Sequence, residues 1–120
     1  MGERTDEHGL ADETLVAVND AMIVLHERYH GRKPVTSRTT MLGEDLLACL
    51  MGDIYTNVEK TMIELQRQSL VSETRSAFQH AMEHRFISSV ELITKRKVAR
   101  FISTTHVGPD LELELFVLEN

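Results

Sequence analysis

Residues 108–118 of the chain read GPDLELELFVL, a turn followed by a regular alternation. The tripeptide at 108–110 is typical of a tight turn, and leucine then alternates with glutamate over 111–115. Successive side chains of a β-strand point to opposite faces of its sheet. We therefore predict a half-buried antiparallel strand with its leucines on the core and its glutamates, Glu112 and Glu114, in water. Residues 98–106 are predicted to be its hairpin partner.

A second hairpin is predicted earlier in the chain, around Gly43. Residues 35–42 are rich in Thr and Val, and residues 44–51 form an apolar run that Gly43 and Gly52 bracket. Such segments on either side of a glycine favour two strands joined by a turn. Cys49 lies inside the apolar run, so we interpret it as a small buried hydrophobic residue and not as a nucleophile.

The first helix is predicted over 12–30. Its apolar residues recur at steps of three and four and make one stripe. These residues are Leu15, Val18, Met22, Leu25 and Tyr29. Asp12 is a suitable N-cap, Gly31 is suitable just past the last turn, and Pro34 prevents continuation. The stretch HERYHGRKP (26–34) is therefore predicted to be a helix exit.

Two more helices are predicted between the hairpins. Thr56 and Glu59 have the spacing of a capping box, which marks a helix start. The apolar stripe then changes phase near Gln68, which predicts a short helix, a bend and a long helix ending near Thr94; one kinked helix is the alternative. The order αββααββ predicts an α+β fold: an antiparallel four-stranded sheet of two hairpins with the helices packed on one face.

Length and composition predict one cytoplasmic domain. The 120 residues suffice for a single core, which we place at 11–120 after a flexible N-terminal stretch over 1–10. The single cysteine fits a reducing compartment. The polar start lacks the apolar region of a signal peptide, and the longest apolar stretch, 15–25, is too short for membrane insertion.

The charge distribution argues against a nucleic-acid partner. The net charge of −6 repels phosphate backbones. A basic cluster at 95–97, with Arg100, is predicted to stabilise the end of the long helix. Contact of this cluster with an acidic partner or with RNA is the alternative.

Residues 26–30, HERYH, match the H-E-x-x-H pattern of zinc hydrolases. There, histidines one helical turn apart hold the metal and the glutamate between them activates water. The corresponding residues are His26, Glu27 and His30, and a zinc-dependent hydrolase is the alternative function. Two features oppose it. Gly31 ends the helix at the second histidine, where fraying would loosen a ligand, and no histidine follows at the six-residue spacing of one large metalloprotease group.

A second histidine pair, His80 and His84, has the same spacing, with Glu83 between. His80 lies about 200° around the helix from the apolar Phe78, so this pair is predicted to face solvent. We do not expect it to meet the first pair. The prediction is therefore no catalytic residue, no metal and no cofactor.

Five features follow one another along the chain: HGRKP (30–34), LLACLMGDIYTNVEK (46–60), Gln66-Arg67, Arg75 and ELFVL (114–118). In this order and spacing they resemble the MpsC-like family, formerly a domain of unknown function. The resemblance covers about 14–118. The residues matched by position are Gly31, Arg32, Pro34, Gly52, Thr56, Glu59, Arg75 and Phe116. Two residues depart from the family pattern: Lys33 replaces a usual glycine and Tyr55 a usual leucine.

The resemblance implies a small cytoplasmic accessory protein of a bacterial system that generates membrane potential by moving sodium and inorganic carbon. No catalytic residue can be carried over. We predict a non-catalytic, dimeric accessory or regulatory module of a cation or bicarbonate transport system. Its binding residues are predicted to be Gly31, Arg32, Pro34 and Arg75. Arg75 lies close to the apolar stripe, and such an arginine usually has an anionic partner. The 111–118 strand, taken as an edge strand, is a possible seam between subunits.

Overall fold

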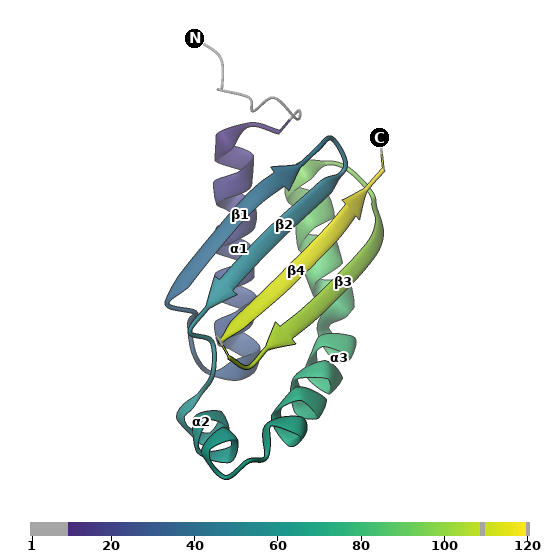
Figure 1. Cartoon of the computed structure of the whole chain (residues 1–120). Helices are drawn as coiled ribbons and strands as arrows, with labels where there is room; N and C mark the ends of the chain where they lie inside the picture. Colours follow the sequence, from purple (N-terminus) through teal and green to yellow (C-terminus); the bar gives the residue numbers. More distant parts are fainter. Residues whose placement is uncertain (1–9, 109, 120) are drawn as a thin grey trace.

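A computed structural model describes residues 10–108 and 110–119 and confirms the predicted order of elements (Figure 1). The elements are α1 (Asp12–His30), β1 (Thr36–Leu42), β2 (Leu46–Gly52), α2 (Asn57–Glu64), α3 (Gln68–Thr94), β3 (Val98–His106) and β4 (Leu111–Leu118). The predicted flexible stretch 1–10 lies outside the described residues except for Leu10, which is buried in the core. The helices and strands therefore follow the expected αββααββ pattern.

The strands form one antiparallel sheet in the order β1-β2-β4-β3. In this order β4 pairs with β2 on one side and with β3 on the other. Cys49 of β2 stands opposite Glu114, and Phe101 of β3 stands opposite Phe116. The expectation that 111–118 is an edge strand is wrong. No strand of another subunit can pair with β4, because its backbone groups already pair on both sides.

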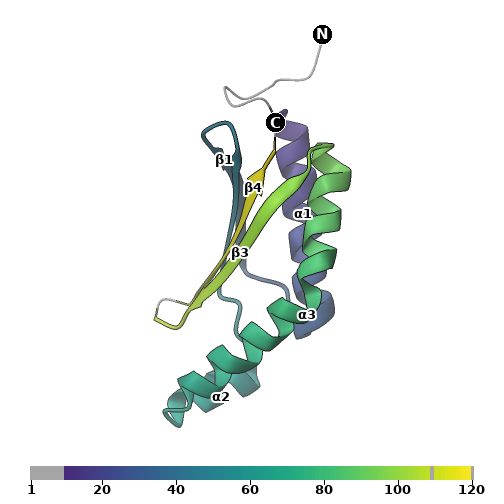
Figure 2. The same ribbon diagram turned by 90° about the vertical axis from the view of Figure 1, so that its right-hand side faces the viewer.

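Helices α1 and α3 cover one face of the sheet and leave the other face open (Figure 2). The first part of α3 extends beyond the end of the sheet, where α2 packs against it. The core lies between the sheet and the two long helices and includes Met22, Leu47, Phe86 and Phe116, each at most 1% exposed. Cys49 is buried there with a free thiol, as predicted.

The orientation of β4 is the reverse of the expected one. Glu112 and Glu114 point to the helices and are completely buried, whereas Leu111, Leu113 and Leu115 point to the open face and are only partly covered. The alternation predicted the strand correctly but assigned its two faces wrongly. Hydrophobicity favours burying the leucines, but polar partners on the helices stabilise the glutamates inside.

Local signals account for the ends of the helices near the site. Helix α1 ends at Gly31, which has the left-handed φ of 74°, and the Gly31 N–H donates to Glu27 O at 2.8 Å. The capping box of α2 is present, with both Thr56 and Glu59 in their expected roles. Helices α2 and α3 are separate, and Gln66 between them has a φ of 61°. The N-cap of α1 is Ala11 and not the predicted Asp12.

Candidate functional site

Arg75 of α3 is the centre of a buried polar network. Its side chain is 1% exposed and contacts three elements besides its own. Nε and Nη2 donate to the two carboxylate oxygens of Glu59 at 2.7 and 2.6 Å. Nη2 also donates to Ile54 O at 2.9 Å, and Nη1 donates to Glu112 Oε1 at 3.2 Å. The arginine is more deeply buried than the sequence suggests, and its cation is balanced by two carboxylates.

Glu59 serves the network and the start of α2 at once. Its Oε1 accepts a hydrogen bond from Thr56 N at 2.9 Å, which is half of the capping box. Burial disfavours the ionised carboxylate, but the hydrogen bonds from Arg75 and Thr56 outweigh it, and the pKa of Glu59 is lowered. The carboxylate is therefore ionised at neutral pH and pairs with the guanidinium.

His26 joins the network from α1. Its Nδ1 lies 2.8 Å from Arg32 O, a carbonyl oxygen that can only accept, so Nδ1 carries the proton and donates. Nε2 then carries the lone pair, which accepts from Arg75 Nη1 at 3.1 Å. Burial lowers the pKa of His26, so the imidazole is neutral at physiological pH. This contact joins Arg75 to the loop that follows α1.

His30 lies one turn further along α1, with its ring 4.7 Å from that of His26. Burial, followed by the nearby Arg75 cation, lowers the pKa of His30 to about 3. Its other neighbour is Phe78, an edge-on ring at 5.4 Å. His30 is therefore a neutral, half-buried imidazole at the end of its helix.

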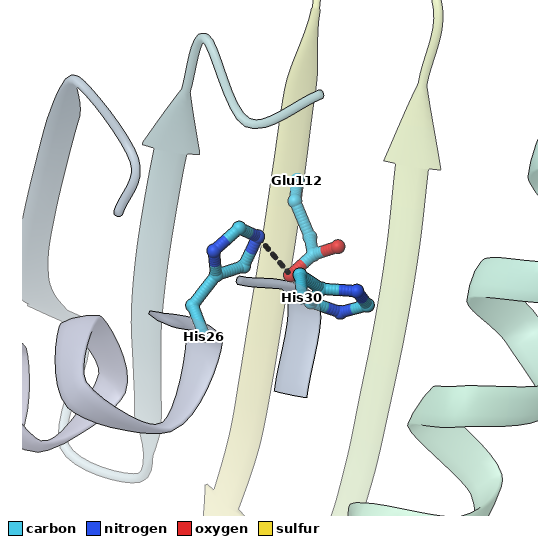
Figure 3. Close-up of side chains that lie close together, drawn as sticks. All are labelled: His26, His30 and Glu112. Atoms are coloured by element: carbon cyan, nitrogen blue, oxygen red, sulfur yellow. Dashed lines mark ion pairs between the residues drawn. The ribbon is translucent and has the colours of Figure 1, made fainter. Parts of the chain in front are cut away.

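Glu112 of β4 brings a carboxylate to the two imidazoles, and Figure 3 shows the three side chains together. One potential ligand atom from each of His26, His30 and Glu112 lies within 4.8 Å of the others. His26 Nε2 is 4.0 Å from Glu112 Oε2. Nitrogen and carboxylate oxygen atoms grouped in this way are a donor set that zinc-class metals accept. Glu27, the glutamate of the H-E-x-x-H pattern, is exposed instead.

The predicted binding residues fall into two groups. Arg32 is tied to the end of β2, with Nη2 at 3.0 Å from Asp53 Oδ1 and Nε at 3.3 Å from Asp53 O. Pro34 is buried and Gly31 is exposed. Arg75 lies inside the protein and reaches the loop only through His26 and the Arg32 carbonyl. Arg75 therefore contacts the loop indirectly from the protein interior and is not part of the surface that Gly31 and Arg32 form.

A second buried carboxylate, Glu114, accepts a hydrogen bond from Gln79 Nε2 at 3.1 Å. Burial and the neighbouring Glu112 raise the pKa of Glu114 well above its ordinary value. Gln79 and Ser103 also line a polar groove of about 300 Å³ between α3 and β3. His80 lies on this groove and His84 is exposed, so the second histidine pair is on the outside of α3, as predicted.

The sequence interpretation missed both glutamates of the network. The signal that identifies them is the alternation along the whole strand, in which even-numbered residues share one face. Phe116 and Leu118 are large, apolar and buried, and they lie on the same face of β4 as Glu112 and Glu114. No local signal connects Glu112 to His26, because the contact forms only when β4 takes its place between β2 and β3.

The fold and the network define a small α+β protein in which two long helices enclose a buried arginine, carboxylate and histidine cluster against one sheet. The chain belongs to the MpsC family, since the family model described as "Na+-translocating membrane potential-generating system (MpsC)" matches residues 13–120. No curated protein and no solved structure matches the chain significantly. Among the described residues, no helix combines the length and apolar character that crossing a bilayer requires.

Proposed function

We propose that this chain is a non-catalytic, dimeric accessory or regulatory module that acts in the cytoplasm beside a cation or bicarbonate transport system. The family match supports the link to a sodium-translocating membrane-potential system. The observation that carries the dimer is the uncovered face of the sheet. The loop that follows α1, with the exposed Gly31, the half-buried Arg32 and the buried Pro34, is the proposed contact with the transport partner.

The open sheet face is apolar along its two central strands, β2 and β4, and each edge strand adds one apolar side chain to it. Its apolar side chains are Leu42, Leu46, Ala48, Leu50, Ile102, Leu111, Leu113, Leu115 and Val117. The edge strands also bring polar side chains to this face, which are Thr36, Arg38 and Thr40 on β1 and Arg100 and Thr104 on β3. Contiguous apolar surface of this kind marks an interface, and sheets pack face to face at about 10 Å.

A second copy of the chain is the occupant that fits this face. A hollow of about 240 Å³ lies over β1, β2 and β4, with Thr40 and Ala48 on its wall. Ile102 projects from β3 with 51% of its surface exposed. The register places Ile102, Leu115, Ala48 and Thr40 in one row across the sheet. A two-fold axis parallel to the strands therefore places Ile102 of each copy over the hollow of the other.

Light scattering tests the dimer directly. We expect the unmodified chain to be a dimer and Ile102→Asp to be a monomer. Leu92→Asp is the matched control, because Leu92 is 81% exposed but lies on α3. It should stay dimeric. A monomeric unmodified chain, or a dimeric folded Ile102→Asp variant, contradicts the proposal.

Co-purification tests the accessory role. The tagged chain should retain an identified subunit of a cation or bicarbonate transport system from a native lysate, as determined by mass spectrometry. Arg32→Ala should reduce this retention while the dimer persists. If the tagged chain is recovered without any transport subunit, the proposed association is wrong. This result would not affect the proposed dimer, which light scattering tests independently.

A further inference from the structure

We propose that His26, His30 and Glu112 form a binding site for a transition-metal dication of the zinc class. The three residues come from the end of α1 and from β4, and their ligand atoms already lie within 4.8 Å of one another. Ligands about 2.0–2.1 Å from a tetrahedral ion are separated by roughly 3.4 Å. Metal binding therefore requires the ligand atoms to approach one another by up to about 1.4 Å. The site does not depend on the dimer or on the transport partner.

Two unsatisfied atoms point to a missing ligand. His30 Nε2 and Glu112 Oε2 are buried, and neither accepts a hydrogen bond from an amide, guanidinium or hydroxyl donor of the described residues, although the Glu114 carboxyl lies within hydrogen-bond reach of the Glu112 carboxylate. Buried polar atoms normally have a partner, and an unpaired one requires an explanation. A cation that binds an imidazole nitrogen and a carboxylate oxygen together satisfies both atoms in one step.

The surrounding hydrogen bonds orient these groups as ligands. His26 donates its Nδ1 proton to Arg32 O at 2.8 Å, which leaves the Nε2 lone pair on the side of the cluster. Glu112 Oε1 is held by Arg75 Nη1 at 3.2 Å, so Oε2 is the oxygen left for the ion. Metal-binding histidines and carboxylates are commonly held in this way by a second layer of hydrogen bonds.

Arg75 competes with the ion at one contact only. Its Nη1 donates to His26 Nε2 at 3.1 Å, and metal binding replaces this hydrogen bond. Arg75 also donates to Glu59, to Ile54 O and to Glu112 Oε1. These three contacts remain, because the ion binds none of the oxygen atoms that accept in them. The two carboxylates exceed the single guanidinium charge, so a dication approaches a cluster whose net charge is negative.

One ligand of the proposed site lies on a cleft that opens to solvent. His30 and Glu59 line a cleft of about 240 Å³ beside α2 and α3. Three protein ligands leave a fourth position for water or a partner's donor atom. Glu27 is exposed, so the base that a hydrolase of this pattern uses does not face the ion. We assign the ion to fastening the end of α1 to β4, beneath the 31–34 loop, and not to hydrolysis.

Titration of the metal-free full-length chain with Co²⁺ and Zn²⁺ tests the site. We expect one ion per chain by calorimetry, with the intense visible absorption of tetrahedral Co²⁺. His30→Ala and Glu112→Gln should each weaken Zn²⁺ binding by more than about 100-fold, since both remove a direct ligand. The matched control is the double variant His80→Ala with His84→Ala, which removes the exposed pair of equal spacing and should bind as the unmodified chain does.

A measurement on the unmodified chain covers the case in which a variant fails to fold. In imidazole ¹H–¹⁵N spectra, Zn²⁺ should shift the signals of His26 and His30 and leave those of His80 and His84 unchanged. The proposal is overturned by absence of binding, by shifts confined to His80 and His84, or by unchanged affinity in folded His30→Ala.

Discussion

Arg75 of α3 and Glu59 of α2 form a two-point ion pair inside the protein, with nitrogen–oxygen distances of 2.7 and 2.6 Å. The pair fastens the two helices to each other and, through Arg75, to β4 and α1. Because Arg75 is 1% exposed, removal of either partner leaves the other with a buried charge that has no counter-ion in this pair. The pair therefore offers the most direct measurement of what the network contributes to stability.

We predict that Arg75→Met lowers the free energy of unfolding by about 3–5 kcal/mol, since it leaves two carboxylates in the interior without their cation. Arg75→Lys should recover little of this loss, because an ammonium group cannot bind both oxygens of Glu59 in the fork geometry. Urea unfolding of the variants measures both effects. Arg67→Met, on the residue that precedes α3, is the control and should change stability by less than about 0.5 kcal/mol. Equal losses at the two positions would contradict the assigned role of the network.

Tyr55 is predicted to make stability depend on alkaline pH. Burial raises the pKa of its hydroxyl from 10 to about 12, so the folded state holds this proton more tightly than the unfolded state does. The resulting stabilisation is complete below pH 10 and is lost as the pH rises towards 12. Stability should therefore fall more steeply between pH 10 and 12 in the unmodified chain than in Tyr55→Phe, as urea unfolding across this range measures. Parallel pH curves would contradict the shift.

Gly31 is predicted to tolerate no side chain without strain. Its φ is 74°, and nothing lies within 4 Å of an added Cβ, so the cost of Gly31→Ala is conformational and amounts to about 1 kcal/mol. Gly108→Ala is the matched control, since its surroundings are equally open and its φ is not in the left-handed range. Thermal unfolding should show a lower midpoint for Gly31→Ala only. A similar decrease in both variants would contradict the conformational explanation.

Cys49 is predicted to resist thiol reagents in the folded chain. The side chain is completely buried, and burial raises the pKa of the thiol, so little reactive thiolate is present near neutral pH. A thiol-reactive dye should label the native protein slowly and label it fully in denaturant. Rapid labelling under native conditions would show that β2 opens frequently or that its inner face is accessible.

The sequence predicted what depends on local chemistry. The capping box of Thr56 and Glu59, the helix exit at Gly31 and the separation of α2 from α3 all follow from residues close together in the chain, and the structure confirms them. The two hairpins were also predicted correctly, since each depends on a short turn. The order of strands within the sheet was not, because it depends on how the hairpins join.

The site depended on contacts that no short pattern encodes. The alternation in 111–115 has the same period whichever face is buried, and hydrophobicity favoured the wrong one. Glu112 is stable inside only because Arg75 and His26 are present, and these lie on helices far away in the sequence. A match to H-E-x-x-H directed attention to Glu27, whereas the carboxylate beside the histidines comes from another element. The family resemblance was confirmed over nearly the whole chain.

The position of β4 between β2 and β3 has a consequence for biosynthesis. On the ribosome, the β1–β2 hairpin and β3 emerge first, and they have no common neighbour until β4 follows. Pairing over such sequence separations is slow, and the waiting edges of β2 and β3 are open to aggregation in the meantime. The chain should therefore acquire protection from protease only after β4 has paired with both β2 and β3, and not when the β1–β2 hairpin or β3 alone has formed.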